Sequence, residues 1–195
     1  TGDVFNLFVF LEISSLTSYA LIASGPDRRA LRASYQYLVM GTVGATFYVI
    51  GVGLLYMMTG TLNMVDLAER LQPVLMTRTV LAAFAFLVVG ISLKLALFPL
   101  HLWLPNAYAY APSVVTAFLA ATATKVSIYV FVRFFYGIFG TAYAFDTLSL
   151  GGFLVPLGLA GIFVASLVAV FQTNIKRMLA YSSIAQVGYM MVGVG

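Results

Sequence analysis

Long apolar runs, interrupted by short polar segments, dominate the chain. Most runs extend for about 20 residues without strict alternation, which is the length that an α-helix needs to cross a bilayer and not the ten-residue alternating pattern of a barrel strand. The pattern predicts six membrane spans in one transmembrane domain, at Val4–Ala23, Tyr35–Met58, Val80–Trp103, Ser113–Tyr136, Leu150–Phe171 and Met178–Gly195. We therefore expect an all-α, polytopic transmembrane helix bundle.

The third span and the connector before it depart from this simple pattern. Pro99 lies inside the third span and Pro105 follows six residues later. A proline removes a backbone hydrogen bond and clashes with the preceding turn, so we expect a broken helix there. In the connector, apolar residues recur at helical spacing, which predicts a short helix lying at the membrane interface, at Met64, Leu67, Ala68 and Leu71.

Composition supports the membrane assignment and excludes several functions. The chain is 62% hydrophobic and 8% charged, whereas a soluble domain carries about 25% charged residues. Its net charge of +4 lies mostly in connecting segments, which indicates membrane orientation and not nucleic-acid binding. With no cysteine, one histidine and six scattered acids, we expect no disulfide, no thiolate-bound cluster, no metal site and no cofactor.

The distribution of basic residues predicts which side faces the cytoplasm. The first and fifth connecting segments carry five cations, more than the three on the opposite side, so we expect those two segments to be cytoplasmic; the five are Arg28, Arg29, Arg32, Lys176 and Arg177.

Three charged residues fall near the middle of separate apolar spans: Glu12, Lys94 and Lys125. A charge at membrane depth costs roughly 2.5–3.5 kcal/mol on insertion scales, so such residues face a protein interior or a watery cavity and tend to mark an ion or proton path. Polar residues share the helix face of two of them. Ser15 and Tyr19 follow Glu12, and Thr122 and Tyr129 flank Lys125.

Lys94 stands five residues before Pro99, and His101 lies inside the expected break. Broken helices in transporters place their free ends near the ion site. Burial lowers the pKa of a lysine and a nearby carboxylate raises it, so a carboxylate that approaches and leaves such an amine would control its proton. Two alternatives stay open: the charges form a proton path, or a Glu–Lys pair only locks the helices together.

Three motifs, in their order and spacing, resemble the proton-translocating antiporter family. They are FVFLEISSLTSYALI, KLALFPLHLWLPNAYAYAPSVVTAFLAATATKVSIYVFVR and NIKRMLAYSSIAQVGYM, and together they cover nearly the whole chain. The family comprises the D and A subunits of Mrp-type cation/proton antiporters and the antiporter-like subunits of respiratory complex I and membrane-bound hydrogenases. The stretches SYQYLVMGTVGATFYVIGVGLLYMMTGTLNM and YAYAPS look most similar to the D-type subunits.

The resemblance implies a larger fold with two inverted five-helix repeats, of which this chain would be an internal piece. It implies that Glu12 pairs with Lys94 on the broken helix and that Lys125 relays protons onward. From the break and the polar face of Lys125, we add His101, Pro99 and Tyr129 as candidate accessory residues. The implied partners are protons, Na⁺ or K⁺, the lipid bilayer and other membrane subunits of a hetero-oligomeric complex in a bacterial cell membrane.

Two functional hypotheses follow, and neither makes the chain catalytic by itself. In the first, it translocates protons in a multisubunit monovalent cation/proton antiporter. In the second, it does so in an NADH–quinone oxidoreductase or a membrane-bound hydrogenase, where redox chemistry elsewhere drives the pump. A third hypothesis makes it a structural membrane subunit.

Overall fold

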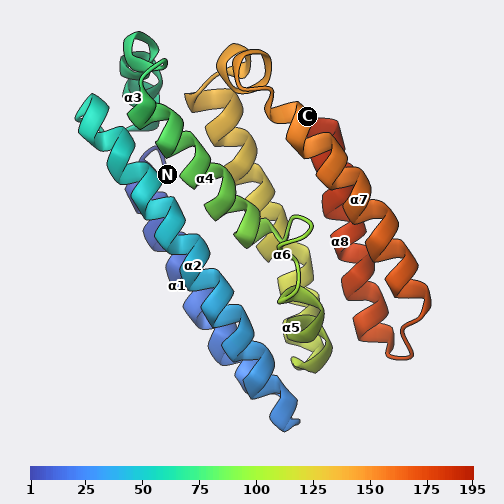
Figure 1. Ribbon diagram of the computed structural model, residues 1–195. Helices are drawn as coiled ribbons and strands as arrows, with labels where there is room; N and C mark the ends of the chain where they lie inside the picture. The colour runs from blue at the N-terminus through green and yellow to red at the C-terminus, as the bar shows by residue number, and fades with distance from the viewer.

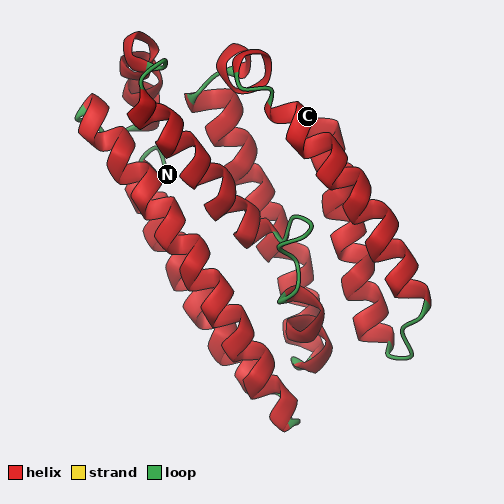
Figure 2. Ribbon diagram, viewed as in Figure 1, coloured by secondary structure: helices red, strands yellow, loops and turns green.

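The computed structural model describes residues 1–195, and the fold consists of helices joined by short connections, without a β-strand (Figure 2). This confirms the predicted all-α class. The eight α-helices are α1 Val4–Ala23, α2 Arg28–Thr59, α3 Met64–Leu71, α4 Arg78–Leu95, α5 Leu104–Tyr110, α6 Ser113–Val132, α7 Leu150–Val170 and α8 Ile175–Val194. A 3₁₀ turn, Gln72–Val74, follows α3, and two π-helical segments, Arg133–Ile138 and Ala142–Thr147, separate α6 from α7.

Five helices are long and apolar enough to cross a membrane: α1, α2, α4, α7, and α6 together with its π-helical extension. They correspond to the first five expected spans. The sixth expected span forms α8, which has 20 residues but is not one of these five. Its two cations and its polar residues lower its hydropathy, so a sixth crossing stays a prediction.

Two helices begin earlier than the apolar pattern predicts, because polar residues cap them. The Asp27 carboxylate accepts a hydrogen bond from the Arg29 backbone N–H, and α2 starts at Arg28 instead of Tyr35. The Asn174 side chain accepts from the first backbone N–H groups of α8, which starts at Ile175 instead of Met178. Side-chain oxygens at these positions satisfy N–H groups that have no partner within the helix. The basic residues of the first and fifth connecting segments therefore lie in the first turns of α2 and α8, except Arg32, which lies in the second turn of α2.

The connectors also differ from expectation in one place. Between the fourth and fifth expected spans, where no helix was expected, the segment Ala142–Thr147 forms a π-helical turn that contains Asp146. The short helix expected in the second connector is present: α3 buries Met64, Leu67 and Leu71 on one face. Its location at the membrane interface stays a prediction.

The helices stand side by side, with α1 and α2 paired along one edge and α7 and α8 forming a hairpin along the other (Figure 1). Helix α2 also packs closely on α4. Gly44 of α2 and Gly90 of α4 face each other so closely that a Cβ atom added to Gly90 would lie 2.8 Å from the Gly44 carbonyl oxygen. Small residues permit such close backbone contact in membrane bundles.

Two apolar clusters form the core of the bundle, and a stretch of α1 belongs to neither cluster. The larger cluster contains Val4 at the start of α1 and the aromatic residues of the α6 extension, while the smaller one contains Tyr19 and Ile22 near the end of α1. Residues 12–18 of α1 lie between the two clusters. Glu12 therefore sits near the middle of a helix that is about 30 Å long.

Candidate functional site

Helix α4 ends at Leu95, one residue after Lys94, and the next residue has a left-handed backbone conformation. Ala96 has φ 60° and ψ 42°, and the Leu97 backbone N–H donates to the Ser92 carbonyl at 3.1 Å. This geometry closes the last turn and directs the chain out of the helix. The non-helical stretch contains Pro99 and continues to Trp103, so the predicted break is confirmed.

Trp103 connects the break back to α4. Its indole Nε1–H donates to the Leu93 carbonyl at 3.1 Å, an acceptor at the helix end that otherwise has only a longer bond of 3.4 Å from the Ala96 backbone N–H. The Trp103 ring stacks on Tyr37 of α2 at a centroid distance of 4.1 Å, and the edge of Tyr19 packs on Tyr37 at 4.7 Å. This aromatic stack holds the residue that directly precedes Lys94 against α1 and α2.

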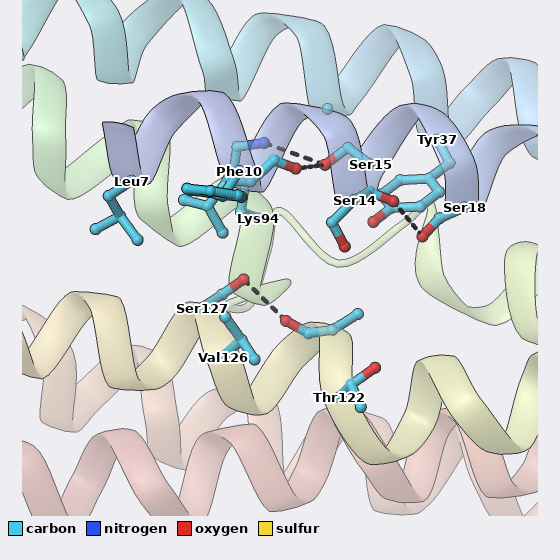
Figure 3. A pocket seen from close by; sticks show the side chains of 13 residues that line it. Leu7, Phe10, Ser14, Ser15, Ser18, Tyr37, Lys94, Thr122, Val126 and Ser127 are labelled. Atoms are coloured by element: carbon cyan, nitrogen blue, oxygen red, sulfur yellow. Dashed lines mark hydrogen bonds between the residues drawn. The ribbon is translucent and has the colours of Figure 1, made fainter. Parts of the chain in front are cut away.

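Lys94 and Glu12 form an ion pair inside the bundle. The Lys94 Nζ lies 2.5 Å from Glu12 Oε1. It also lies 3.4 Å from the Ser15 hydroxyl oxygen (Figure 3). Only 8% of the Lys94 side chain and 23% of the Glu12 side chain are exposed. Hydrogen bonds between ionised partners are shorter and stronger than neutral ones. The structure thus brings together two of the three predicted charges, together with Ser15.

A cavity of about 180 Å³ adjoins Lys94 between α1 and α6 (Figure 3). This volume has room for several water molecules. Its polar lining comes from three helices besides α4: three serines of α1, one tyrosine of α2 and two hydroxyl residues of α6, which are Ser14, Ser15, Ser18, Tyr37, Thr122 and Ser127.

Most of these hydroxyls donate to their own helices and keep acceptor capacity toward the cavity. Ser15 donates to the Leu11 carbonyl at 2.8 Å, Ser18 to the Ser14 carbonyl at 2.7 Å, and Ser127 to the Ala123 carbonyl at 3.0 Å. A hydroxyl oxygen that donates its hydrogen still carries lone pairs that accept from water or ammonium. The cavity is therefore suited to water and to protonated, cationic groups.

Lys125 lies apart from the pair. It does not line the cavity, its side chain is exposed, and its Nζ donates to the Ala120 carbonyl of its own helix at 2.6 Å. Tyr129, four residues on, is 59% exposed and accepts a hydrogen bond from Arg133 at 2.8 Å. The cavity reaches α6 through Thr122 and Ser127 instead. The relay role of Lys125 stays a prediction.

The accessory residues of the break also lie outside the cavity. His101 is 6% exposed, stacks on Phe98 at a centroid distance of 5.3 Å, and has an Nδ1 atom with no hydrogen-bond partner. Pro99 is exposed in the break. Neither residue contacts the Glu12–Lys94 pair through a hydrogen bond, and their accessory role stays a prediction.

The sequence reasoning missed several residues of the site. Ser14 and Ser18 were detectable, because they extend the polar stripe of α1 at helical spacing. Tyr37 was not, since its helix carries aromatic residues on several faces and its role depends on which face meets α1. Nowhere in the chain do three or more His, Asp or Glu side chains gather as a metal site would require.

Comparison with known proteins gives one family over the whole chain. The family model described as NADH:quinone oxidoreductase/Mrp antiporter, TM, matches residues 1–195. The NADH-quinone oxidoreductase subunit N of Desulforudis audaxviator is 51% identical over all 195 residues, which span 38% of its length. The D-type subunit of the Na⁺/H⁺ antiporter of Alkalihalophilus pseudofirmus is 40% identical over the whole chain, which spans 39% of its length.

A solved structure shares the fold. A chain of an archaeal respiratory membrane complex, the membrane-bound sulfane sulfur reductase, superimposes with a TM-score of 0.89 at 38% identity, over 98% of this chain and 39% of that chain. The protein thus spans less than two fifths of the length of each of these relatives.

Proposed function

We infer that this chain, which belongs to the NADH:quinone oxidoreductase/Mrp antiporter transmembrane family, forms part of the proton pathway of a multisubunit membrane complex. The observation that carries the proposal is the Glu12–Lys94 pair beside a hydroxyl-lined cavity, near the middle of α1 and between the two apolar clusters of the bundle. A pair that served only to lock helices would need no adjoining polar cavity.

Protons move through such a site because the pair can open and close. While Glu12 contacts Lys94, it stabilises the ammonium form of the lysine. When Glu12 moves away, Lys94 loses its partner in a site with little access to bulk water, and the amine releases its proton to water in the cavity. The serine and threonine hydroxyls hydrogen-bond to this water, and the proton passes through it from the α1 side of the cavity to the α6 side.

Lys125 takes the next position in the proposed path. It lies on the same helix as Thr122 and Ser127, which line the cavity, but does not line the cavity itself. A transfer from Lys94 to Lys125 therefore requires Lys125 to leave the Ala120 carbonyl and turn toward water. Its long side chain permits such a movement.

In the first functional assignment, the chain belongs to a monovalent cation/proton antiporter of a bacterial cell membrane, together with other membrane subunits. The proton flow then exchanges H⁺ for Na⁺ or K⁺. The 40% identity to the D-type subunit of an Na⁺/H⁺ antiporter supports this assignment.

A second assignment is also supported, by a relative of higher sequence identity. The 51% identical relative is named as a subunit of an NADH-quinone oxidoreductase, and the matching structure is a respiratory complex. Here redox chemistry in other subunits would drive the same proton path. The proteins that copurify with the full-length subunit separate the two assignments: flavin and iron–sulfur subunits indicate the redox complex, and their absence together with cation-dependent proton movement indicates the antiporter.

The proton path is tested by replacing Lys94 in the full-length protein within its complex. Lys94→Ala should abolish proton movement in inverted membrane vesicles while the complex still assembles. Lys94→Arg should also be impaired, because arginine does not readily give up its proton. Arg28→Ala removes an exposed cation at the start of α2 and serves as the control that should retain transport. Normal transport by Lys94→Ala would show that the pair only holds helices together.

A further inference from the structure

Two hollows adjoin each other at the end of the bundle where α2 begins, away from the Lys94 cavity. The first is polar, has a volume of about 220 Å³ and lies between α2 and α5. The second is apolar, has a volume of about 270 Å³ and lies between α2 and the break after α4. Gln36 lines both hollows, and neither shares a lining residue with the Lys94 cavity.

The polar hollow carries two cations and no acid in its lining. Arg29 and Arg32 project from successive turns of α2, with Gln36 one turn further on. Arg29 lies over the Tyr110 ring at 5.8 Å and 3.6 Å from the Asp27 carboxylate, whereas Arg32 has no ion pair. Asn106 donates to the Gln36 side-chain oxygen at 3.0 Å. Guanidinium groups match the geometry of phosphate oxygens, so this hollow suits a phosphate.

The apolar hollow continues from the polar one along α2. Its lining includes Tyr35 and Leu102, which are 66% and 72% exposed, and the buried ring of Trp103. Because α2 rises about 1.5 Å per residue, the apolar lining at residues 35–40 lies roughly one turn or more deeper than Arg32. A basic hollow at the helix start and an apolar groove below it reproduce the order of headgroup and acyl chain in a phospholipid.

The charge of this end of the bundle favours an anionic ligand. It carries five cations, Arg28, Arg29, Arg32, Lys176 and Arg177, and one acid, Asp27. The beginnings of α2 and α8 lie at the same end of the molecule (Figure 1). The opposite end carries three cations against four acids, which are Asp3, Asp66, Glu69 and Asp146. The net positive charge is thus concentrated where the polar hollow opens.

We propose that Arg29 and Arg32, together with the groove below them, form a binding site for one anionic phospholipid. The phosphate contacts the two guanidinium groups and the Gln36 amide, and one acyl chain lies in the groove against Trp103. A transmembrane helix of a neighbouring subunit is a poorer occupant, because a helix is about 10–12 Å across and the groove has only about 270 Å³. The proposal is independent of whether the Glu12–Lys94 pair carries protons.

The test uses the full-length protein in its complex, purified in detergent and stripped of lipid. Native mass spectrometry then measures binding of dioleoyl-phosphatidylglycerol, with zwitterionic dioleoyl-phosphatidylcholine as the comparison. Phosphatidylglycerol should bind at least about fivefold more tightly to the unmodified protein. Arg32→Gln should weaken this binding about fivefold, since a basic residue near an anionic headgroup contributes on that order.

Arg28→Gln is the matched control. It removes the same charge from the same end of α2, but Arg28 lines neither hollow, so binding should change less than twofold. If Arg28→Gln and Arg32→Gln weaken phosphatidylglycerol binding equally, the lipid is attracted by the general surface charge and the proposed site is wrong. Equal binding of the two lipids by the unmodified protein would overturn it as well.

A second variant distinguishes a lipid from a free phosphate. Val39→Trp fills the apolar groove without touching the arginines. It should weaken phosphatidylglycerol binding and leave weak binding of inorganic phosphate unchanged. If Val39→Trp has no effect and millimolar phosphate displaces the lipid completely, the hollow binds phosphate alone. A crosslink from residue 39 to a helix of another subunit would show that a subunit, and not a lipid, occupies the groove.

Discussion

Lys94 Nζ lies 2.5 Å from Glu12 Oε1, although 82 residues separate the two along the chain. Helix α2 makes this approach possible, because it packs on both α1 and α4. Gly41 of α2 lies against Tyr19 of α1, and Gly44 lies against Gly90 of α4. The ion pair therefore depends on small residues that are not part of it.

Removing one member of the pair should cost stability, and removing both should restore part of it. Lys94→Met leaves Glu12 without its partner in a mostly buried site, which should destabilise the bundle by about 2–4 kcal/mol, since Glu12 keeps some access to water. In Lys94→Met/Glu12→Gln no ionised group remains, and the thermal unfolding temperature of the purified complex should rise above that of Lys94→Met. A double variant as unstable as the single one contradicts the pairing.

The contact between α2 and α4 should tolerate no side chain at Gly90. A Cβ atom there would lie 2.8 Å from backbone atoms of Gly44 and Tyr48, so Gly90→Ala should destabilise the protein by about 1–3 kcal/mol. Gly53→Ala is the control, because a Cβ atom at Gly53 meets nothing within 4 Å. This control should be neutral or stabilising by up to about 1 kcal/mol. Thermal unfolding of both variants in the same detergent checks the difference, and equal effects would argue against the tight contact.

The indole hydrogen bond of Trp103 should matter for transport more than for assembly. Trp103→Phe keeps a ring that can stack on Tyr37 but leaves the Leu93 carbonyl with only the longer bond from the Ala96 backbone N–H. We expect a loss of about 0.5–1.5 kcal/mol in stability. Because Leu93 precedes Lys94, we also expect proton transport to fall severalfold while the complex still forms. Unchanged transport in vesicles would show that the break does not need this bond to position Lys94.

Lys125 should affect transport without supporting the fold. Its ammonium donates to one carbonyl of its own helix and forms no ion pair. Lys125→Met should therefore leave the unfolding temperature unchanged or raise it, since a charge at membrane depth is costly. Proton transport should fall at least tenfold if Lys125 is the next site of the path. Retained transport would remove Lys125 from the path and leave the Glu12–Lys94 pair in place.

Helix α3 should weaken at acidic pH through Asp66, which lies outside the membrane spans. The Thr61 hydroxyl and the Arg70 guanidinium, 2.7 Å away, hold the pKa of Asp66 below its usual range. A carboxylate with a lowered pKa contributes stability above its unfolded pKa of about 3.9, and that contribution disappears as the pH falls through the lower folded value. Hydrogen exchange of α3 amides should show this loss of protection.

Two variants on α3 check the pH effect. Asp66→Asn should remove the pH dependence and give the weaker protection at all pH values. Glu69→Gln, on the same helix but without an ion pair, should behave like the unmodified protein. A pH dependence that survives in Asp66→Asn would assign it to another group.

The sequence by itself determined the class of fold, the position of most helices and the break after Lys94. These features depend on local sequence. A long apolar run in a membrane has to make its backbone hydrogen bonds within a helix, and Pro99 lacks the N–H group that a continued α4 would need. The first helix has the predicted bounds, and α3 contains the apolar positions from which it was expected. The beginnings of α2 and α8 were missed because Asp27 and Asn174 extend the helices beyond the apolar runs.

Only the tertiary structure decided which charges meet. Helical spacing gives the face of a residue but not the helix that this face contacts. The approach of Glu12 to Lys94 was therefore expected only from the family resemblance, and the separate position of Lys125 was not expected at all; packing decides both. The same holds for Tyr37 and Trp103, whose contacts join three segments distant in sequence. The burial of a side chain and the partner of a charge depend on which helices are neighbours, and the sequence of an apolar span does not specify its neighbours.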